Sequence, residues 1–230
     1  TKSKQVVSGS QGQMQLDVPG LKRVVAKFDG GAVCSDGGLL LLRKADLRLG
    51  LTELASFAIR DERRPDYVQH TITDMMKQRI YGIAAGYEDC NDAGQLRHDA
   101  MHKLAVGREA GSNRALASQP SLSRFENNVD AIANAALQRL LVHLFVKQTK
   151  KPPKVLRLAM DTTCDETYGT QQLSFYNGYY EAFCFAPLFI FTDCGFPLCA
   201  LLRPGNPNPI DDAKRMLKKV IHELRLSWPN

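Results

Sequence analysis

The sequence predicts a mixed fold, in which a helical N-terminal domain precedes a smaller α/β domain. Apolar residues recur with a helical period as far as about residue 148. A basic stretch with two adjacent prolines follows at 147–154, and β-rich runs dominate beyond it. We therefore expect a flexible lead over residues 1–20, a helical domain over 21–148 and a second domain over 152–230.

Helical periodicity places four helices in the first domain. They are expected at 39–50, 68–83, 100–106 and 128–146. The first opens after Gly37-Gly38 with four consecutive leucines and suits a buried helix that ends near Gly50. Asp99 is placed to cap the third helix. Ahead of all four, Val24 and Val25 favour a short strand.

A further helix is expected to begin at Ser123. Ser123 and Glu126 have the spacing of a capping box, in which the two side chains satisfy free N–H groups at a helix start. The segment has two interpretations, and both stay open. In one, it is the recognition element of a helix-turn-helix, and Ser121, Ser123 and Arg124 reach DNA phosphates and base edges. In the other, it is a capped structural helix with Phe125 in the core.

The second domain is expected to begin with three consecutive antiparallel strands. They are predicted at 155–160, 179–191 and 197–202, with a turn at 193–195 between the last two. A helix over 211–226 follows, and its apolar side is expected to pack on this meander. Lysine and arginine crowd its other flank, for which a solvated face is the commoner explanation.

Composition and charge narrow the class of protein. The 230 residues are 44% hydrophobic and 23% charged, as in a soluble globular protein that buries a core. A net charge of +6 leans basic and favours an anionic partner such as nucleic acid. No apolar run reaches the roughly 18–20 residues that a membrane helix needs, and the polar N-terminus lacks the apolar core of a signal peptide. We expect a cytoplasmic protein with no membrane partner.

The cysteines and histidines do not predict a zinc site. Six cysteines are scattered without a Cys-x-x-Cys pair, so we expect reduced thiols. His98 and His102 are four residues apart, which on one continuous helix would put both on one face. However, Asp99 is expected to begin the helix between them, and no third ligand is evident.

Asp161 is the candidate catalytic residue. It stands at the C-terminal end of the first predicted strand, where a carboxylate leaves a buried sheet and faces a crevice. Such a place suits a metal ligand. An isolated aspartate at a strand end is also a common turn former or cap, so position alone leaves both interpretations open.

Five strings of residues carry a resemblance to a known family. They are SDGGLLLLR at 35–43, YGIAAGYED at 81–89, LASQPSLSRFEN at 116–127, DTTCDETYGTQQ at 161–172 and FYNGYY at 175–180. In this order they resemble the bacterial DDE transposases of insertion-sequence family 1380, and the similarity runs through nearly all of residues 21–230. Several ordered, unusual strings are far more specific than one motif.

The resemblance implies a ribonuclease-H-like core that cuts DNA at transposon ends and joins it to a target. It also implies three carboxylates around two Mg²⁺ ions, because two metals stabilise the attacking and leaving oxygens of a phosphodiester displacement. Asp161 matches the first carboxylate, as catalytic residue and metal ligand. The other two would lie beyond Asn230. We therefore expect the N-terminal part of a transposase, with a truncated core that is inactive alone.

One departure from the family pattern concerns Cys164, which stands where another acid is expected. The neighbouring Asp165 remains a candidate to support the metal site without touching the metal. A plain turn residue is the alternative interpretation for Asp165.

Double-stranded DNA is the partner that these observations predict. Lys150, Lys151 and Lys154 in the basic stretch suit contacts with its phosphate backbone. A homodimer stays open. The chief rival interpretation is a non-catalytic DNA-binding remnant or an inhibitor that competes for transposon ends, and a third is another nuclease with the same core fold.

Overall fold

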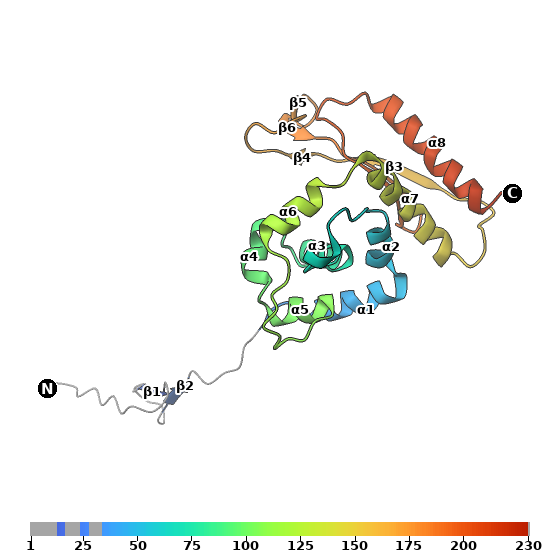
Figure 1. The fold of residues 1–230 in the computed structure, drawn as a ribbon. Helices are drawn as coiled ribbons and strands as arrows, with labels where there is room; N and C mark the ends of the chain where they lie inside the picture. Colours follow the sequence, from blue (N-terminus) through green and yellow to red (C-terminus); the bar gives the residue numbers. More distant parts are fainter. Residues whose placement is uncertain (1–12, 17–23, 28–33, 230) are drawn as a thin grey trace.

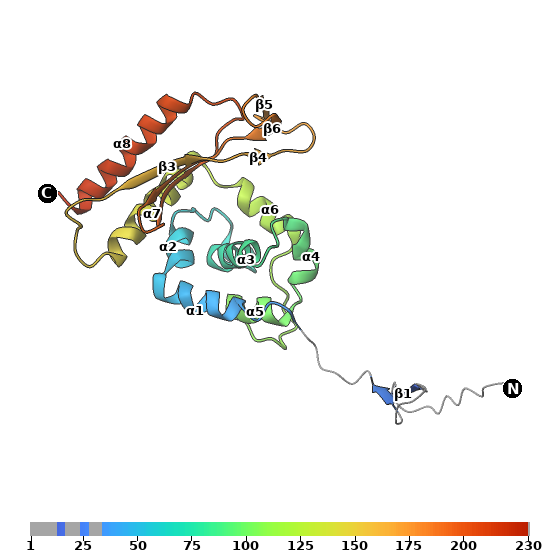
Figure 2. The same cartoon turned by 180° about the vertical axis from the view of Figure 1, so that it is seen from behind.

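The computed structural model describes residues 13–16, 24–27 and 34–229. Its α-helices are α1 (Leu39–Leu49), α2 (Leu51–Phe57), α3 (Ile72–Ala84), α4 (Ala93–Leu96), α5 (Ala100–Val106), α6 (Gln119–Asn127), α7 (Ala131–Gln148) and α8 (Pro209–Ser227). Helices α1 to α5 form one body, and α7 lies between that body and α8 (Figures 1 and 2). The helices expected at 39–50, 68–83, 100–106, 128–146 and 211–226 are thereby confirmed within a few residues.

Helix α1 is not the buried helix that its leucines predicted. Only Leu39 and Asp46 are buried along it, whereas Leu41 is 73% exposed and Leu47 is 66% exposed. Four consecutive leucines cover the whole circumference of a helix, and one face of α1 packs against α5. The predicted end is confirmed, because Gly50 follows the helix in the left-handed conformation with φ of 73°.

Helix α6 begins at Gln119, four residues before the predicted start at Ser123. Pro120 lies in its first turn, where a fixed φ and a missing N–H are tolerated. Ser123 is therefore an interior residue. Glu126 pairs with Arg79 of α3 and does not reach back to a helix start. The capping-box prediction was wrong.

The strands pair in three antiparallel sheets within the described ranges. The bounds are β1 (Gln13–Leu16), β2 (Val24–Lys27), β3 (Leu158–Thr162), β4 (Asp165–Glu166), β5 (Phe175–Asn177), β6 (Ala182–Phe185), β7 (Leu188–Thr192) and β8 (Pro197–Leu201). The main sheet has the order β3-β7-β8, which confirms an antiparallel meander. A second sheet, with the order β4-β6-β5, was not predicted.

The strand expected at Val24 is confirmed, and it pairs with β1. β1 lies inside the segment that was predicted to be a flexible lead, so four residues of that lead are a strand. The other residues of the expected lead lie outside the described ranges.

The single strand expected at 179–191 is two strands in different sheets. Pro187 lies between β6 and β7 and has no N–H to offer a ladder, so the chain changes sheets there. The N–H of Ala186 bonds to the C=O of Arg203 instead, at 3.0 Å. The first strand also begins at Leu158 and not at 155, because its partner β7 ends opposite Leu158, at Thr192.

Three apolar clusters lie within the described ranges, and α7 contributes to the two larger ones. Ala133, near the start of α7, belongs to a core with residues of α3 and α6. Val142 and Phe145 belong to a second core, which α8 forms with the main sheet. Between them, the Gln138 amide bonds both backbone groups of Ala200 on β8. These bonds cover one edge of the main sheet.

Among the described helices, none is by itself both long and apolar enough to cross a membrane. Taken together, α6 and α7 meet the requirements of length and composition, but they are bent by 89° at the break between them. Both also contribute buried side chains to the helical core.

Candidate active site

Asp161 lies on β3, one residue before the strand ends. It is opposite Phe189 of β7, and its side chain is exposed. The sequence placed it beyond a buried sheet, but β3 is an edge strand of the main sheet. The backbone N–H of Thr162 donates to Asp161 Oδ1 at 2.9 Å. The second carboxylate oxygen accepts no hydrogen bond within the described structure and is available to a cation.

Two side chains from distant parts of the sequence hold the end of β3. The Tyr180 hydroxyl donates to the C=O of Thr162 at 3.1 Å. The Arg203 guanidinium donates to Thr162 Oγ1 and to the C=O of Ala186, both at 2.8 Å. Burial raises the pKa of Tyr180, and the acidic groups around it, Asp161 among them, raise it further. Tyr180 is therefore a hydroxyl donor at neutral pH.

Asp165 lies on a different sheet from Asp161. It is exposed on β4, opposite Phe185 of β6. Next to it, Cys164 contacts the thiol of Cys184, whose pKa is raised to about 11, mainly by burial. Across the described ranges, no three His, Cys, Asp or Glu side chains are arranged to hold a metal ion. Asp161 and Asp165 by themselves are thus not a complete metal site.

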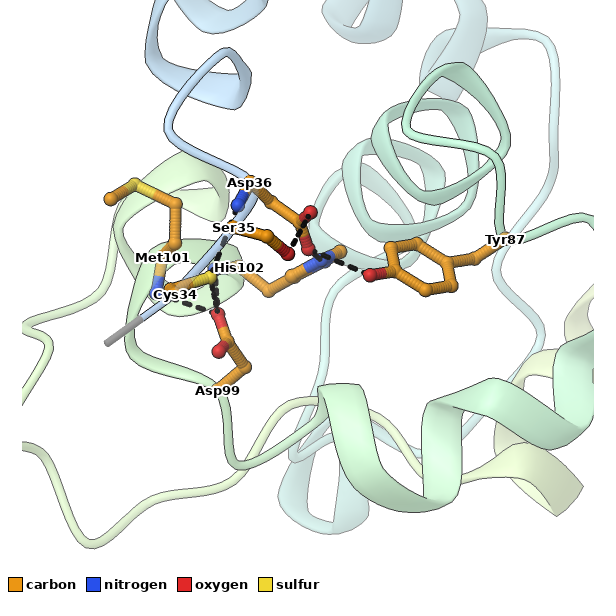
Figure 3. A network of polar contacts seen from close by, with 7 residues as sticks. All are labelled: Cys34, Ser35, Asp36, Tyr87, Asp99, Met101 and His102. Atoms are coloured by element: carbon orange, nitrogen blue, oxygen red, sulfur yellow. Dashed lines mark hydrogen bonds and ion pairs between the residues drawn. The ribbon is translucent and has the colours of Figure 1, made fainter. Parts of the chain in front are cut away.

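Two of the five strings that carry the resemblance meet in a polar network of the helical region (Figure 3). Asp36 accepts hydrogen bonds from Ser35 and from Tyr87, each at 3.0 Å, and its Oδ2 lies 3.1 Å from Nε2 of the buried His102. Asp99 caps α5 as predicted, because it accepts from the N–H of His102 at 2.9 Å. The network joins the start of α1 to α5 and to the loop after α3. Ser35, Asp36 and Tyr87 of these two strings therefore stabilise the fold.

A groove of about 490 Å³ runs between α6 and residues 59–75, and we call it the arginine groove. It brings Ser121 and Arg124 together with Arg60 and Arg63, which the sequence analysis did not select. Asp61 holds Arg63 through two hydrogen bonds of 2.7 Å. Arg124 has no ion-pair partner in the described part of the chain. The signal for this cluster was three arginines within residues 60–64.

The structural interpretation of α6 is confirmed in part. Phe125 is 7% exposed and packs in the helical core together with Leu122. Ser123 does not line the arginine groove, and its hydroxyl accepts from Asn127 at 3.4 Å. Of the three residues expected to touch DNA from this helix, the structure brings Ser121 and Arg124 together and leaves Ser123 apart.

Comparison with known protein families identifies the family of this chain. A family model described as Transposase DDE domain group 1 matches residues 17–230. The chain belongs to this family. No curated protein matches the chain, and no solved structure matches it. A transposase acts on DNA, which agrees with the anionic partner expected from the basic net charge.

In this transposase, the three lysines expected to touch DNA lie apart from the arginine groove. Lys150, Lys151 and Lys154 are exposed on the loop that follows α7. Helix α6, which lines the groove, precedes α7. The two clusters therefore lie at opposite ends of an 18-residue helix, which is about 27 Å long. A single duplex would have to span about this distance to contact both clusters.

Proposed function

We propose that the chain is the N-terminal part of a DDE transposase of insertion-sequence family 1380, and that this enzyme cuts and joins DNA at transposon ends. The family match supports the class of reaction. The meander β3-β7-β8, with α8 packed on it, supports a ribonuclease-H-like core over 152–230. The observation that carries the proposal is the exposed carboxylate of Asp161 on the edge strand of that sheet.

Asp161 fits a divalent cation, for which we propose Mg²⁺. The N–H of Thr162 fixes one carboxylate oxygen, so that the other keeps a defined direction for the ion. When bound, such ions stabilise charge on the attacking and leaving oxygens of a phosphodiester displacement. Asp165 lies on β4, the next strand along the chain but in the second sheet, and is proposed to support the site without touching the ion.

The two further carboxylates of a DDE site are proposed to reach Asp161 across the free edge of β3. In the main sheet, β3 has β7 on one side only. An edge strand presents unpaired N–H and C=O groups to which another strand can add. With Asp161 as its single carboxylate on this edge, residues 1–230 alone are proposed not to cleave DNA.

Residues 21–148 are proposed to bind DNA through the arginine groove, with Lys150, Lys151 and Lys154 as a second contact. Cations that neutralise phosphates release counterions, so binding is expected to weaken steeply with salt. Arg124→Ala should weaken binding and lower the salt slope by about 1. Ser123→Ala is the matched control on the same helix and should bind DNA like the wild type, because Ser123 does not line the groove. Undetectable duplex binding at low salt would indicate a dimerisation unit instead.

Cleavage of a duplex that carries the transposon ends tests the catalytic assignment in the complete transposase. Asp161→Asn is expected to abolish metal-dependent cleavage and to leave DNA binding nearly intact, because the amide keeps the shape but loses the charge. Asp193→Asn, in the exposed turn after β7, is the matched control and should cleave like the wild type. Full cleavage by the Asp161→Asn variant would overturn the assignment. Binding without cleavage by the complete wild-type protein would favour a DNA-binding remnant or inhibitor.

A further inference from the structure

The end of β3 contains a buried cation without an acidic partner. Arg203 follows β8 and is only 3% exposed. Its guanidinium donates to two neutral acceptors, the C=O of Ala186 and the Oγ1 of Thr162. Within the described part of the chain it has no ion-pair partner, and its Nη1 has no acceptor.

Fold stability alone explains this arrangement poorly. Burying an unpaired charge is costly, and an apolar residue of similar volume often serves a core equally well. Burial lowers the pKa of Arg203, and Asp212 acts in the opposite direction, but a guanidinium stays charged at neutral pH. The chain therefore keeps a buried positive charge against the side chain of Thr162, the residue that follows Asp161.

Arg203 also lies at the junction of the two sheets, which the chain crosses three times. Thr162 ends β3, Ala186 links β6 to β7, and Arg203 itself follows β8. The C=O of Arg203 accepts from the N–H of Ala186, which closes a reciprocal pair of hydrogen bonds. The guanidinium thus fixes the end of β3 relative to both sheets. Thr162 in turn fixes Asp161 through its N–H.

We propose that Arg203 is the positioning residue of the active site. It holds Thr162 and, through Thr162, sets the direction of the Asp161 carboxylate toward the metal ion. The proposal rests on the proposed function, in which Asp161 is a metal ligand. Arg203 is buried, so it acts through the protein and touches neither DNA nor metal. A misplacement of about 1 Å at a reacting centre can lower a rate by about 100-fold.

Thr162 offers a test that leaves both Arg203 and Asp161 in place. Thr162→Val keeps the shape of the side chain but removes the acceptor for Arg203, whereas Thr162→Ser keeps the hydroxyl. In the complete transposase, Thr162→Val is expected to lower metal-dependent cleavage by about 10- to 100-fold. Thr162→Ser should cleave at nearly the wild-type rate. Equal cleavage by the two variants would overturn the proposal.

A second readout needs no DNA cleavage. Fe²⁺ bound in place of Mg²⁺ reduces added hydrogen peroxide to hydroxide and a hydroxyl radical, which cuts the protein backbone next to the metal, and ascorbate returns the resulting Fe³⁺ to Fe²⁺. The wild-type transposase should be cut beside Asp161. Thr162→Val should lose most of this cut, and Thr162→Ser should keep it. Urea denaturation of the same variants checks that Thr162→Val is still folded under the conditions of the cut.

The Asp161→Asn variant distinguishes a failure of the positioning role of Arg203 from a failure of the proposed function of Asp161. Loss of the local cut in both Asp161→Asn and Thr162→Val supports the positioning role. Loss in Asp161→Asn alone overturns that role and leaves the proposed function standing, whereas an unchanged cut in Asp161→Asn overturns the proposed function. Arg203→Lys keeps the buried charge but cannot reach both acceptors, and it replaces Thr162→Val if that variant fails to fold. A wild-type cut and cleavage rate in Arg203→Lys would also overturn the role.

Discussion

The helical region and the sheet region use aspartate in opposite ways. In the helical region, the buried Asp46 accepts hydrogen bonds from the N–H and hydroxyl of Thr52 and from the hydroxyl of Tyr81. In the sheet region, the exposed Asp161 accepts one hydrogen bond, from its own neighbour. The same residue type completes the fold in one region and is left available for chemistry in the other.

The difference extends to the strings that resemble the family. In the helical region, Asp36 and Tyr87 of two such strings bond to each other. The sheet region leaves large side chains uncovered on and beside its second sheet, as α1 does in the helical region. The most exposed aromatic residues there are Tyr168, Tyr176, Tyr179 and Phe183. Surface that folding leaves uncovered is where a DNA-cutting enzyme can take its substrate.

The largest expected effect comes from the same substitution made in the two regions. Asp46→Ala leaves the buried hydroxyls of Tyr81 and Thr52 without their acceptor, and should lower the free energy of unfolding by about 2–5 kcal/mol. Asp161→Ala removes an exposed side chain and should change it by no more than about 0.5 kcal/mol. Urea denaturation of both variants measures the contrast. Equal losses would show that Asp161, like Asp46, stabilises the fold.

A smaller effect is expected within the second sheet, at Gly205. A Cβ atom there would meet the backbone oxygens of Phe175 on β5 and Cys184 on β6. Gly205→Ala should therefore destabilise this sheet by about 1–3 kcal/mol. Gly178→Ala is the matched control in the same region, because a Cβ atom at Gly178 has open space around it.

Hydrogen exchange of the β5 and β6 amides shows which part of the chain the Gly205→Ala substitution destabilises. Faster exchange confined to these strands would show that the second sheet opens separately from the helical core. Equal acceleration in α3 and α7 would mean that the two regions unfold as one unit, and the comparison would lose its basis.

Sequence reasoning succeeded where the signal is local. Helical periodicity predicted α3 and α7, and the turn at 193–195 separated β7 from β8 as expected. It missed the second sheet because these strands have only two to four residues and leave side chains such as Phe183 exposed. No alternating pattern arises from so short a strand.

In the candidate site, too, one residue could be predicted from the sequence and another could not. Asp161 could be selected from its own string of residues, which resembles a family pattern. Arg203 could not, because the partners that give it a role lie 17 and 41 residues away, at Ala186 and Thr162. A lone arginine after a strand carries no signal of such contacts. Roles that depend on long-range contacts become visible only in the folded chain.

The smallest expected effect depends on pH and concerns Asp36 in the helical region. Burial works against its ionisation, but hydrogen bonds from His102, Ser35 and Tyr87 outweigh burial and lower its pKa below the ordinary 3.8. A carboxyl group with a lower pKa in the folded than in the unfolded state stabilises the fold above the unfolded value. That contribution is lost as the pH falls through 3.8 toward the folded pKa.

Asp36→Asn should therefore lower the free energy of unfolding by about 1 kcal/mol at neutral pH, and the difference from wild type should shrink below about pH 4. Urea denaturation between pH 3 and pH 7 measures it, with Asp193→Asn in the sheet region as the control. The control should show no such trend, because its exposed side chain forms no ion pair in the described structure. A loss that stayed constant with pH would mean that Asp36 acts by shape and not by charge.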